Sequence, residues 1–191
     1  MAHLTFRPDG AGWAGSADGT RLLHTRDGGA TWKAIDAPFG VLPLAALQAT
    51  PTMLIAATYD GRTHSAELWN STDDGMSWQR GARATTPWPV VATAAQPPLL
   101  TLGGLLFVLG PDGAWKQHRV GDGAGVRRLV SDGKMLFALT PNQLLQSPDL
   151  GATWAPQPDA PPAHTILDLA TAGDALYLLL ESGQVLRRPL G

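Results

Sequence analysis

Short apolar runs, each bounded by turn-forming residues, recur along the whole chain. Three clear examples are residues 53–59 (MLIAATY), 166–170 (ILDLA) and 175–180 (ALYLLL). Runs of this length, flanked by Gly, Pro, Asp and Ser, are typical of β-strands and shorter than most amphipathic helices. The pattern therefore predicts many short strands joined by tight turns.

Composition supports the same fold class. The 191 residues include 22 glycines and 16 prolines, which are the residues that tight turns require. Glutamate is a good helix former, and it occurs only as Glu67 and Glu181. We therefore predict an all-β protein without long solvated helices.

A pattern of eight residues, Ser/Thr-x-Asp-x-Gly-x-Ser/Thr-Trp, occurs three times, at residues 25–32, 71–78 and 147–154. A shorter version at residues 110–115 keeps only the aspartate and the tryptophan of the pattern. The positions that define the repeat are Thr25, Asp27, Gly29, Thr31, Trp32, Ser71, Asp73, Gly75, Ser77, Trp78, Asp112, Trp115, Ser147, Asp149, Gly151, Thr153 and Trp154.

The tryptophans that end these segments give the period of the repeat. Intervals of 46, 37 and 39 residues separate Trp32, Trp78, Trp115 and Trp154. A period near 40 residues with strand-like content matches the four-stranded blade of a β-propeller. We expect one small propeller domain over residues 1–191, with five blades at about 3–35, 42–80, 89–120, 126–156 and 165–190.

The last of these blades has three predicted strands and no outer strand. Either this blade stays three-stranded, or the chain pairs with another copy to close a larger ring.

The repeated pattern resembles the Asp-box, or BNR, repeat of sialidase-like propellers and of the photosystem II assembly-factor family. In such a repeat the hydroxyl and the carboxylate accept hydrogen bonds from turn N–H groups, and the glycine supplies a positive φ. The resemblance implies that the motif lies in the hairpin between the third and outer strands, away from any active site. Asp27, Asp73 and Asp149 are therefore expected to be structural, not catalytic or metal-binding.

The resemblance also raises the question of sialidase activity. That chemistry needs an arginine triad, a tyrosine nucleophile with a glutamate partner, and an aspartic acid/base. The chain has only Tyr59 and Tyr177, and although Glu67 could neighbour Tyr59 across a hairpin, no further acid is expected beside them. We therefore predict a protein that is not an enzyme, with glycoside hydrolysis as the least favoured function.

Other reactive motifs do not occur in the sequence. It contains no Gly-x-Ser-x-Gly segment and no His pair with zinc-ligand spacing, and the glycine-rich residues 121–125 suit a blade link better than a phosphate loop. There is no cysteine, so disulfides and thiolate metal sites do not arise. We predict no cofactor and no metal.

The longer loops define a candidate binding face. In an antiparallel meander, turns alternate between two rims, and the rim opposite the repeated motifs receives residues 60–65, 80–88 and 117–122. Aromatic and arginine side chains on such loops are typical of binding sites. The candidate binding residues are Tyr59, Arg62, His64, Arg80, Arg83, Trp88, His118 and Arg119. The alternative is that Trp88 caps a blade edge and that the arginines are ordinary solvated charges.

Charge and hydropathy limit the partners. With 14 Lys+Arg against 16 Asp+Glu and a net charge of −2, we expect no nucleic-acid binding, and without an apolar run of about 18 residues we expect no membrane insertion. The N-terminus lacks a signal peptide, which indicates the cytoplasm at face value, or export if a leader has been removed. An excess of arginine over lysine, eleven to three, suggests a bacterial genome.

The leading prediction is a binding or scaffold propeller whose loop-rich face contacts a protein partner, or which serves as a subunit of a larger assembly. The alternative is a carbohydrate-binding propeller in which Trp88 and Tyr59 stack on a sugar.

Overall fold

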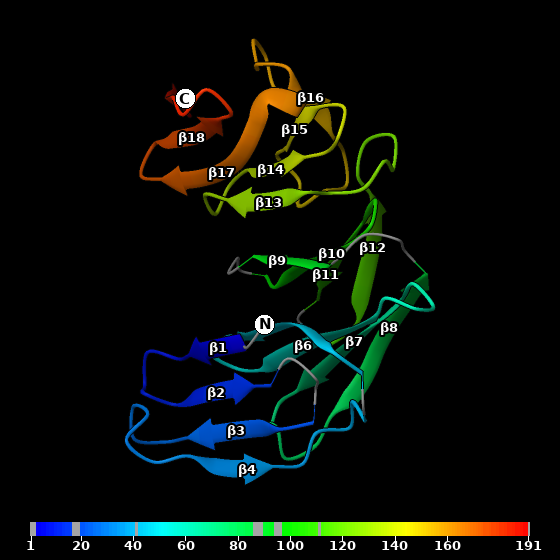
Figure 1. Ribbon diagram of the computed structural model, residues 1–191, viewed down its shortest axis with the longest axis vertical. Helices are drawn as coiled ribbons and strands as arrows, with labels where there is room; N and C mark the ends of the chain where they lie inside the picture. The colour runs from blue at the N-terminus through cyan, green and yellow to red at the C-terminus, as the bar shows by residue number, and fades with distance from the viewer. Residues whose placement is uncertain are drawn as a thin grey trace. The chain divides into compact units, whose positions relative to one another are not determined.

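The computed structural model describes residues 3–16, 20–40, 42–85, 90–93, 97–110 and 112–190. The chain forms two units, Met1–Val90 and Val91–Gly191. Within the described ranges the structure consists of antiparallel sheets, each a simple meander of consecutive strands (Figure 1).

The first unit contains two four-stranded sheets. The first sheet comprises β1 (His3–Phe6), β2 (Gly12–Gly15), β3 (Leu22–Thr25) and β4 (Lys33–Ile35), and the second comprises β5 (Leu44–Ala49), β6 (Leu54–Asp60), β7 (Ser65–Ser71) and β8 (Gln79–Thr85).

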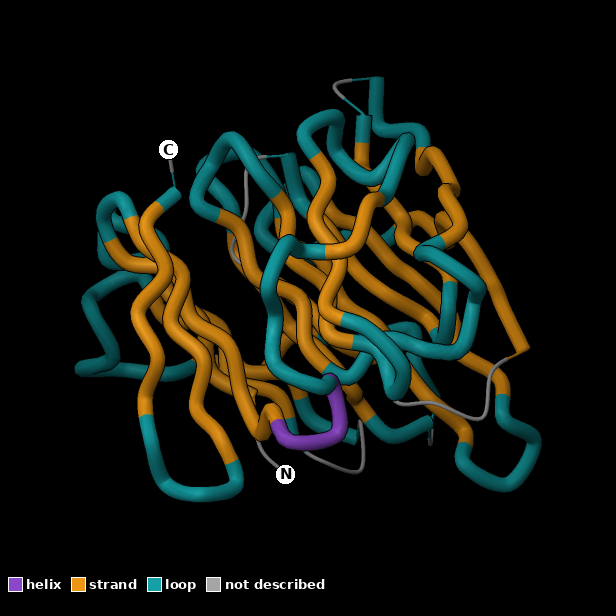
Figure 2. The backbone as a smooth tube through the Cα atoms, turned by 90° about the horizontal axis from the view of Figure 1, so that it is seen from above, coloured by secondary structure: helices purple, strands orange, loops and turns teal. Residues whose placement is uncertain are grey.

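The remaining strands form three further sheets. The third comprises β9 (Val90–Thr93), β10 (Leu99–Leu102), β11 (Leu105–Leu109) and β12 (Trp115–Arg119), and the fourth comprises β13 (Arg128–Ser131), β14 (Leu136–Leu139), β15 (Leu144–Ser147) and β16 (Ala155–Pro156). A short 3-10 turn, Ala163–Thr165, precedes the fifth sheet of β17 (Ile166–Ala172), β18 (Ala175–Leu180) and β19 (Val185–Pro189). Figure 2 shows this turn in purple among the orange strands.

Burial explains why these segments are strands. Middle strands such as β10 and β14 are buried at every residue. In β14, Leu136 and Ala138 lie in the cluster shared with the third sheet, and Phe137 and Leu139 lie in the cluster shared with the fifth. Outer strands such as β12 and β19 keep several exposed residues. The apolar runs in the sequence therefore mark inner strands, and the more polar segments mark sheet edges.

Neighbouring sheets within each unit pack face to face. In the first unit, Trp13 and Leu22 of the first sheet share a buried cluster with Leu44 and Leu54 of the second. In the second unit, Phe137 of the fourth sheet packs in a cluster with apolar residues of the fifth. These contacts form the cores that hold successive sheets together.

The five sheets confirm the predicted class, an all-β small propeller whose last sheet has three strands. One predicted boundary is wrong. The second blade does not end near Arg80, because β8 continues to Thr85 and pairs with β7 as far as Ser65. The single-domain assignment remains a prediction.

Candidate functional site

The three repeated turns, residues 25–32, 71–78 and 147–154, have one hydrogen-bond pattern. In the second turn, Asp73 Oδ1 accepts from the Ser71 hydroxyl at 2.8 Å and from the Ser77 main-chain N–H at 2.8 Å. Its Oδ2 accepts from the Ser77 hydroxyl at 2.6 Å, while the Ser71 hydroxyl accepts from the Gly75 N–H at 2.9 Å. The corresponding bonds recur around Asp27 and Asp149. Both oxygens of each carboxylate are thus engaged inside the turn.

These bonds favour the ionised carboxylate. The Thr25 hydroxyl is the largest cause that lowers the pKa of Asp27 to about 2. The hydroxyls of Ser77 and Thr153 are the largest causes that lower the pKa of Asp73 and of Asp149 to about 2. Because hydrogen bonds to the charged form hold off the proton, these groups are poorly suited to act as acids near neutral pH.

Two successive residues in each turn adopt positive φ. The pairs are Gly28 and Gly29, Asp74 and Gly75, and Leu150 and Gly151, with φ between 56° and 95°. In the sequence, the repeat required a glycine only at the second position. The first position is therefore a strained left-handed site when Asp74 or Leu150 occupies it.

The shorter fourth copy keeps only part of this pattern. Asp112 Oδ1 accepts from the Ala114 N–H at 3.1 Å, but no hydroxyl residue occupies the first position of this copy. The turn is closed by main-chain bonds instead: the Gly110 N–H donates to the Ala114 oxygen at 2.8 Å, and the Gly113 N–H donates to the Gly110 oxygen at 3.0 Å.

The turn between β6 and β7 carries three of the candidate binding residues. Asp60 accepts from the Arg62 N–H at 2.9 Å and from the Thr63 hydroxyl at 2.8 Å, and these bonds, with that of Thr63 the largest cause, lower the pKa of Asp60. His64 has a φ of 52°, and its Nδ1 lies 3.1 Å from the Tyr59 hydroxyl. Asp60 therefore shapes a turn that sets His64 against Tyr59 and leaves the Arg62 side chain in solvent.

Arg80 and Arg83 lie on strand β8, not in a loop as predicted. The two guanidinium groups flank the Glu67 carboxylate of β7, with Nε–O distances of 3.7 and 3.8 Å. The Arg80 guanidinium also lies 5.1 Å from the centre of the Trp69 ring, a cation–π distance. Sheet pairing, with a bulge between Glu67 and Trp69, brings both arginines to one carboxylate.

Tyr59 and Glu67 do not form a nucleophile pair. The register joins Tyr59 to Ala66 and Thr58 to Glu67, so the Tyr59 and Glu67 side chains emerge on opposite faces of the sheet. Tyr59 instead contacts His64, and Glu67 contacts the two arginines. Tyr59 and Glu67 are therefore not arranged as the tyrosine nucleophile and glutamate partner of a sialidase.

His118 and Arg119 belong to the second unit, at the end of β12. The Arg119 guanidinium donates to the Asp122 main-chain oxygen and lies so close to Gly123 that a Cβ there would come within 2.9 Å of it. Asp122 in turn accepts from Asn142 at 2.9 Å. Arg119 therefore supports the link at residues 121–125. Fewer N–H groups of its guanidinium then remain available to a partner.

The candidate residues thus fall into separate groups. Tyr59, Arg62 and His64 share a turn, Arg80 and Arg83 share a strand beside it, and His118 and Arg119 lie in the other unit. Trp88 lies outside the described residues. Glu67, the partner of Arg80 and Arg83, was expected from the sequence only beside Tyr59.

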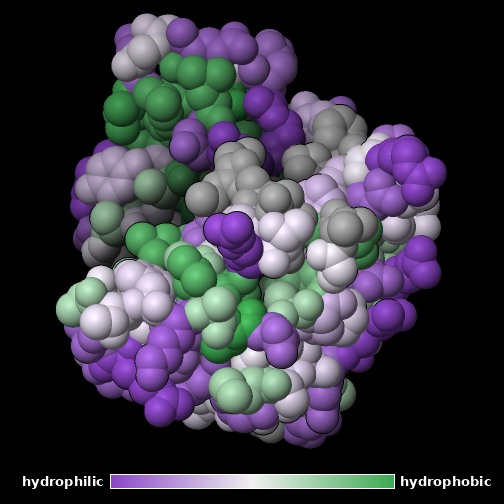
Figure 3. Space-filling model, turned by 60° about the horizontal axis from the view of Figure 1, so that its bottom comes forward, coloured by the Kyte–Doolittle hydropathy of each residue, from purple (hydrophilic) through white to green (hydrophobic). Residues whose placement is uncertain are grey.

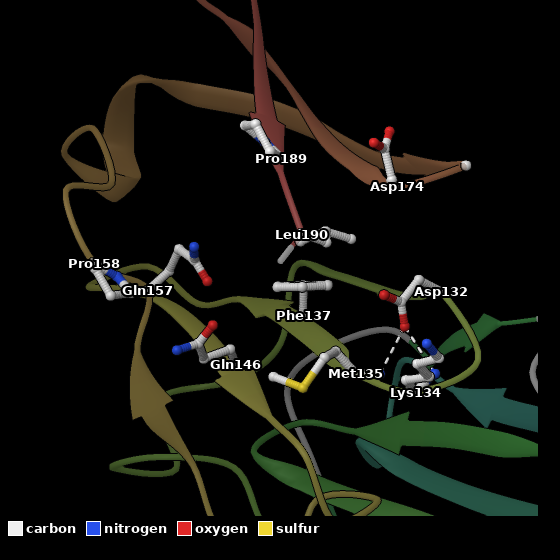
Figure 4. Close-up of a pocket in the computed structure, with 11 residues that line it drawn as sticks. Asp132, Lys134, Met135, Phe137, Gln146, Gln157, Pro158, Asp174, Pro189 and Leu190 are labelled. Carbon is white, nitrogen blue, oxygen red and sulfur yellow. Dashed lines mark hydrogen bonds between the residues drawn. The ribbon is translucent and has the colours of Figure 1, made fainter.

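A cavity of about 480 Å3 between the fourth and fifth sheets also escaped the sequence analysis. Figure 4 shows Met135 and Phe137 on one side of it and Leu190 facing them, with Gln146 and Gln157 at one end. Its lining comes from segments spread between residues 132 and 190, so no local pattern could reveal it.

Two further findings concern metal sites and membrane spans in the described part of the chain. No three His, Asp or Glu side chains there are grouped as a metal site requires. No helix within the same ranges is long and apolar enough to cross a membrane.

No protein-family model and no curated protein matches the chain. Solved structures do match it. YCF48 bound to a D1 peptide is 18% identical with a TM-score of 0.67, over 98% of this chain and 62% of that chain. YCF48 from Cyanidioschyzon merolae is 15% identical with a TM-score of 0.63, over 98% of this chain and 71% of that chain. The GH74 enzyme of Niastella koreensis is 15% identical with a TM-score of 0.66, over 98% of this chain and 29% of that chain.

At these identities the likeness establishes the fold and no more. The chain spans about three fifths, 62%, of the length of the first of these structures. The comparisons therefore place this chain among the β-propellers.

Proposed function

We propose that this chain is an Asp-box propeller that binds a protein partner, and that residues 1–191 act as one propeller domain. The hydrogen-bond pattern of the three repeated turns supports the Asp-box assignment. Because both oxygens of each turn carboxylate are already engaged, these turns act as structural supports, and binding is assigned to another surface.

The observation that carries the proposal is the pair of arginines on β8, Arg80 and Arg83. Their side chains are 59% and 63% exposed. Arg62 in the neighbouring turn is 85% exposed, but its guanidinium lies 3.8 Å from the Asp60 carboxylate. Glu67, which is 12% exposed, lies between Arg80 and Arg83 and compensates one of their two positive charges. The other is available to a partner carboxylate.

Arginine suits this role because its planar guanidinium can donate two parallel hydrogen bonds to a carboxylate. Glu67 holds Arg80 and Arg83 in position, which reduces the entropy lost when a partner binds. The proposed ligand is therefore an acidic, extended protein segment. A propeller of similar fold is known with a bound peptide, which supports this class of ligand.

Binding of a fluorescein-labelled oligoglutamate peptide, followed by anisotropy, tests the proposal. We expect R80A/R83A to weaken binding at least about tenfold, and added salt to weaken binding to the unaltered chain. R187A is the matched control, since Arg187 is similarly exposed at 51% but lies on the fifth sheet. An oligolysine peptide controls for nonspecific attachment.

The proposal fails if R80A/R83A binds the oligoglutamate peptide as tightly as R187A while both variants unfold at the temperature of the unaltered chain. Retention of the chain on a glycan array, lost in Y59A, would instead favour the carbohydrate-binding alternative.

A further inference from the structure

The joint between the first and second sheets contains a cavity of about 370 Å3 beside the first repeated turn. This volume lies at the small end of the range for ligand sites in proteins. The lining comes from β3, from β4, from the turn that joins them and from Met76 of the second repeated turn. All of these residues belong to the first unit, so the cavity lies within that unit.

Strand pairing explains why the cavity has both polar and apolar walls. His24 of β3 pairs with Lys33 of β4, and paired residues project on the same side of a sheet. Ile35, two residues further along β4, shares that side and packs against the cluster common to the first two sheets. A Cβ on Gly75 would lie 2.8 Å from Ile35. This close approach of the second repeated turn brings its next residue, Met76, to the cavity.

His24 is a buried polar group of the lining whose position is fixed. It is 8% exposed, and its ring stacks on that of Trp13 at 4.9 Å, with 10° between the ring planes. Burial is the largest cause that lowers the pKa of His24, so the imidazole is uncharged near neutral pH. Its Nε2 has no hydrogen-bond partner in the described structure. A buried nitrogen of this kind calls for a partner, and an acceptor on a ligand would provide one.

Two positively charged side chains also line the cavity, those of Arg26 and Lys33. Both residues are exposed, and no ion pair found within the described ranges includes either of them. The one carboxylate of the lining, that of Asp27, is already bonded at both oxygens inside its turn. The lining therefore has a net positive charge, and its available groups are suited to an anion.

Ile35 and Met76 supply the apolar part of the lining. Met76 is 70% exposed, and its flexible thioether adapts to the shape of a ligand. Figure 3, which brings the β4 side of the first unit forward, shows green apolar side chains among the purple polar ones on this surface. An apolar group bound here would remove part of the exposed methionine surface from water, which favours binding.

We propose that this cavity binds a small carboxylic acid with an apolar body. The carboxylate is held by Arg26 and Lys33 and accepts the hydrogen of His24 Nε2, while the apolar body lies against Ile35 and Met76. Charge-assisted hydrogen bonds to a carboxylate are strong, and the apolar contact distinguishes this ligand from an inorganic anion. The site is separate from the arginine pair of β8 and does not depend on the function proposed for that pair.

Titration calorimetry with 3-phenylpropionate tests the ligand class. We expect 3-phenylpropionate to bind at least about tenfold more tightly than 3-phenylpropionamide, which has the same body without the charge. Acetate, which has the charge without the body, should also bind at least about tenfold more weakly. Added salt should weaken binding of 3-phenylpropionate and leave that of the amide unchanged.

Variants of the lining locate the site. R26Q/K33Q should weaken binding of 3-phenylpropionate at least about tenfold, and M76D should weaken it because a negative charge replaces an apolar contact. The matched control is K116Q/K134Q, which removes the same charge from exposed positions of the second unit. His24→Phe keeps a ring against Trp13 and should weaken binding about fivefold. Melting temperatures establish that each variant is folded.

The C-terminal residue of a peptide offers the same chemistry as a free acid. Acetyl-Gly-Gly-Phe with a free carboxylate is therefore compared with 3-phenylpropionate. Tighter binding of the peptide would assign the site to peptide C-termini, and tighter binding of 3-phenylpropionate to free acids.

Proton–carbon NMR gives a readout that is independent of affinity. Bound 3-phenylpropionate should shift the ring signals of His24 and the methyl signal of Met76, and leave the ring signals of His118 in place. The inference is overturned if R26Q/K33Q binds 3-phenylpropionate as tightly as K116Q/K134Q, or if the amide binds as tightly as the acid. It is also overturned if the ligand shifts signals of the second unit alone.

Discussion

The Arg7 guanidinium donates to the Asp74 carboxylate at 2.7 Å, although 67 residues separate the two in sequence. Arg7 also donates to the Thr50 main-chain oxygen at 2.8 Å and lies 4.6 Å from the centre of the Trp13 ring. The Trp13 indole N–H donates to the main-chain oxygen of Asp74 at 3.0 Å. One residue of the second repeated turn is therefore held by two side chains of the first sheet.

Removal of Arg7 should weaken the joint between the first two sheets. The side chains of Arg7 and Asp74 are 11% and 32% exposed, and loss of charged hydrogen bonds at such a site costs roughly 2 kcal/mol of unfolding free energy. We expect urea unfolding to show this loss for R7A and a smaller loss for R7K, which keeps the charge but not the planar fork. If R7A/D74A loses less stability than the sum of the losses in R7A and D74A, the two side chains are coupled. Simple additivity would contradict the pairing.

Leu150 is a site where a substitution should stabilise the protein. Its φ of 56° is costly for a side chain with a Cβ, and Leu150→Gly should raise the free energy of unfolding by about 0.5 to 1 kcal/mol. The matched control is Gly151→Ala in the same turn, where φ is 86° and a Cβ would approach Leu106 to 2.2 Å. That change should lower stability by about 2 kcal/mol. The melting temperatures of both variants test this prediction. Equal shifts of the melting temperature in the same direction would contradict a strained backbone at Leu150.

The repeated turns should make the fold sensitive to acid below about pH 4. Asp27, Asp73 and Asp149 have a pKa of about 2 in the folded chain, below the ordinary value of about 3.9 for an unfolded aspartate. Because the unfolded chain binds these protons first, the stabilisation is complete above about pH 4 and is lost as the pH falls toward 2. We expect the melting temperature to drop across this interval, and to drop less steeply in D27N/D73N/D149N. D36N, which alters an exposed aspartate outside the repeats, should keep the slope of the unaltered chain.

His24 should contribute a second pH dependence at higher pH. Burial is the largest cause that lowers its pKa from 6.5, its ring stacks on Trp13 at 4.9 Å, and its Nε2 has no hydrogen-bond partner in the described structure. Protonation is therefore easier in the unfolded chain, so stability is full above about pH 6.5 and decreases as the pH falls below that value. His24→Phe keeps an aromatic ring and should remove this slope, whereas His118→Gln should leave it. A slope unchanged in His24→Phe would assign the effect to another group.

The repeats and their spacing could be predicted from the sequence because the interactions that define them are local. Ser71, Asp73, Gly75 and Ser77 bond one another within one turn, so eight adjacent residues contain everything that the turn requires. The same holds for the inner strands, whose apolar side chains report burial directly. The all-β class, the approximate position of each sheet and the three-stranded last sheet followed from these local signals.

The candidate binding residues were only partly predictable. Arg62 and His64 belong to a turn that Asp60 specifies locally, and the sequence placed them correctly in a loop. Arg80 and Arg83 were assigned to a loop, but the pairing of β8 with β7 extends to Thr85. That extension depends on cross-strand bonds and a bulge, and neither leaves a pattern in adjacent residues.

The sequence by itself therefore determined the repeating unit of this protein: its turns, its inner strands and its period. Only the tertiary structure decided which side chains meet, from Arg7 with Asp74 to Glu67 with Arg80 and Arg83. The physical reason is that a turn is closed by hydrogen bonds between near neighbours, whereas the face on which a strand residue emerges depends on register. Register is fixed by pairing and packing with distant parts of the chain.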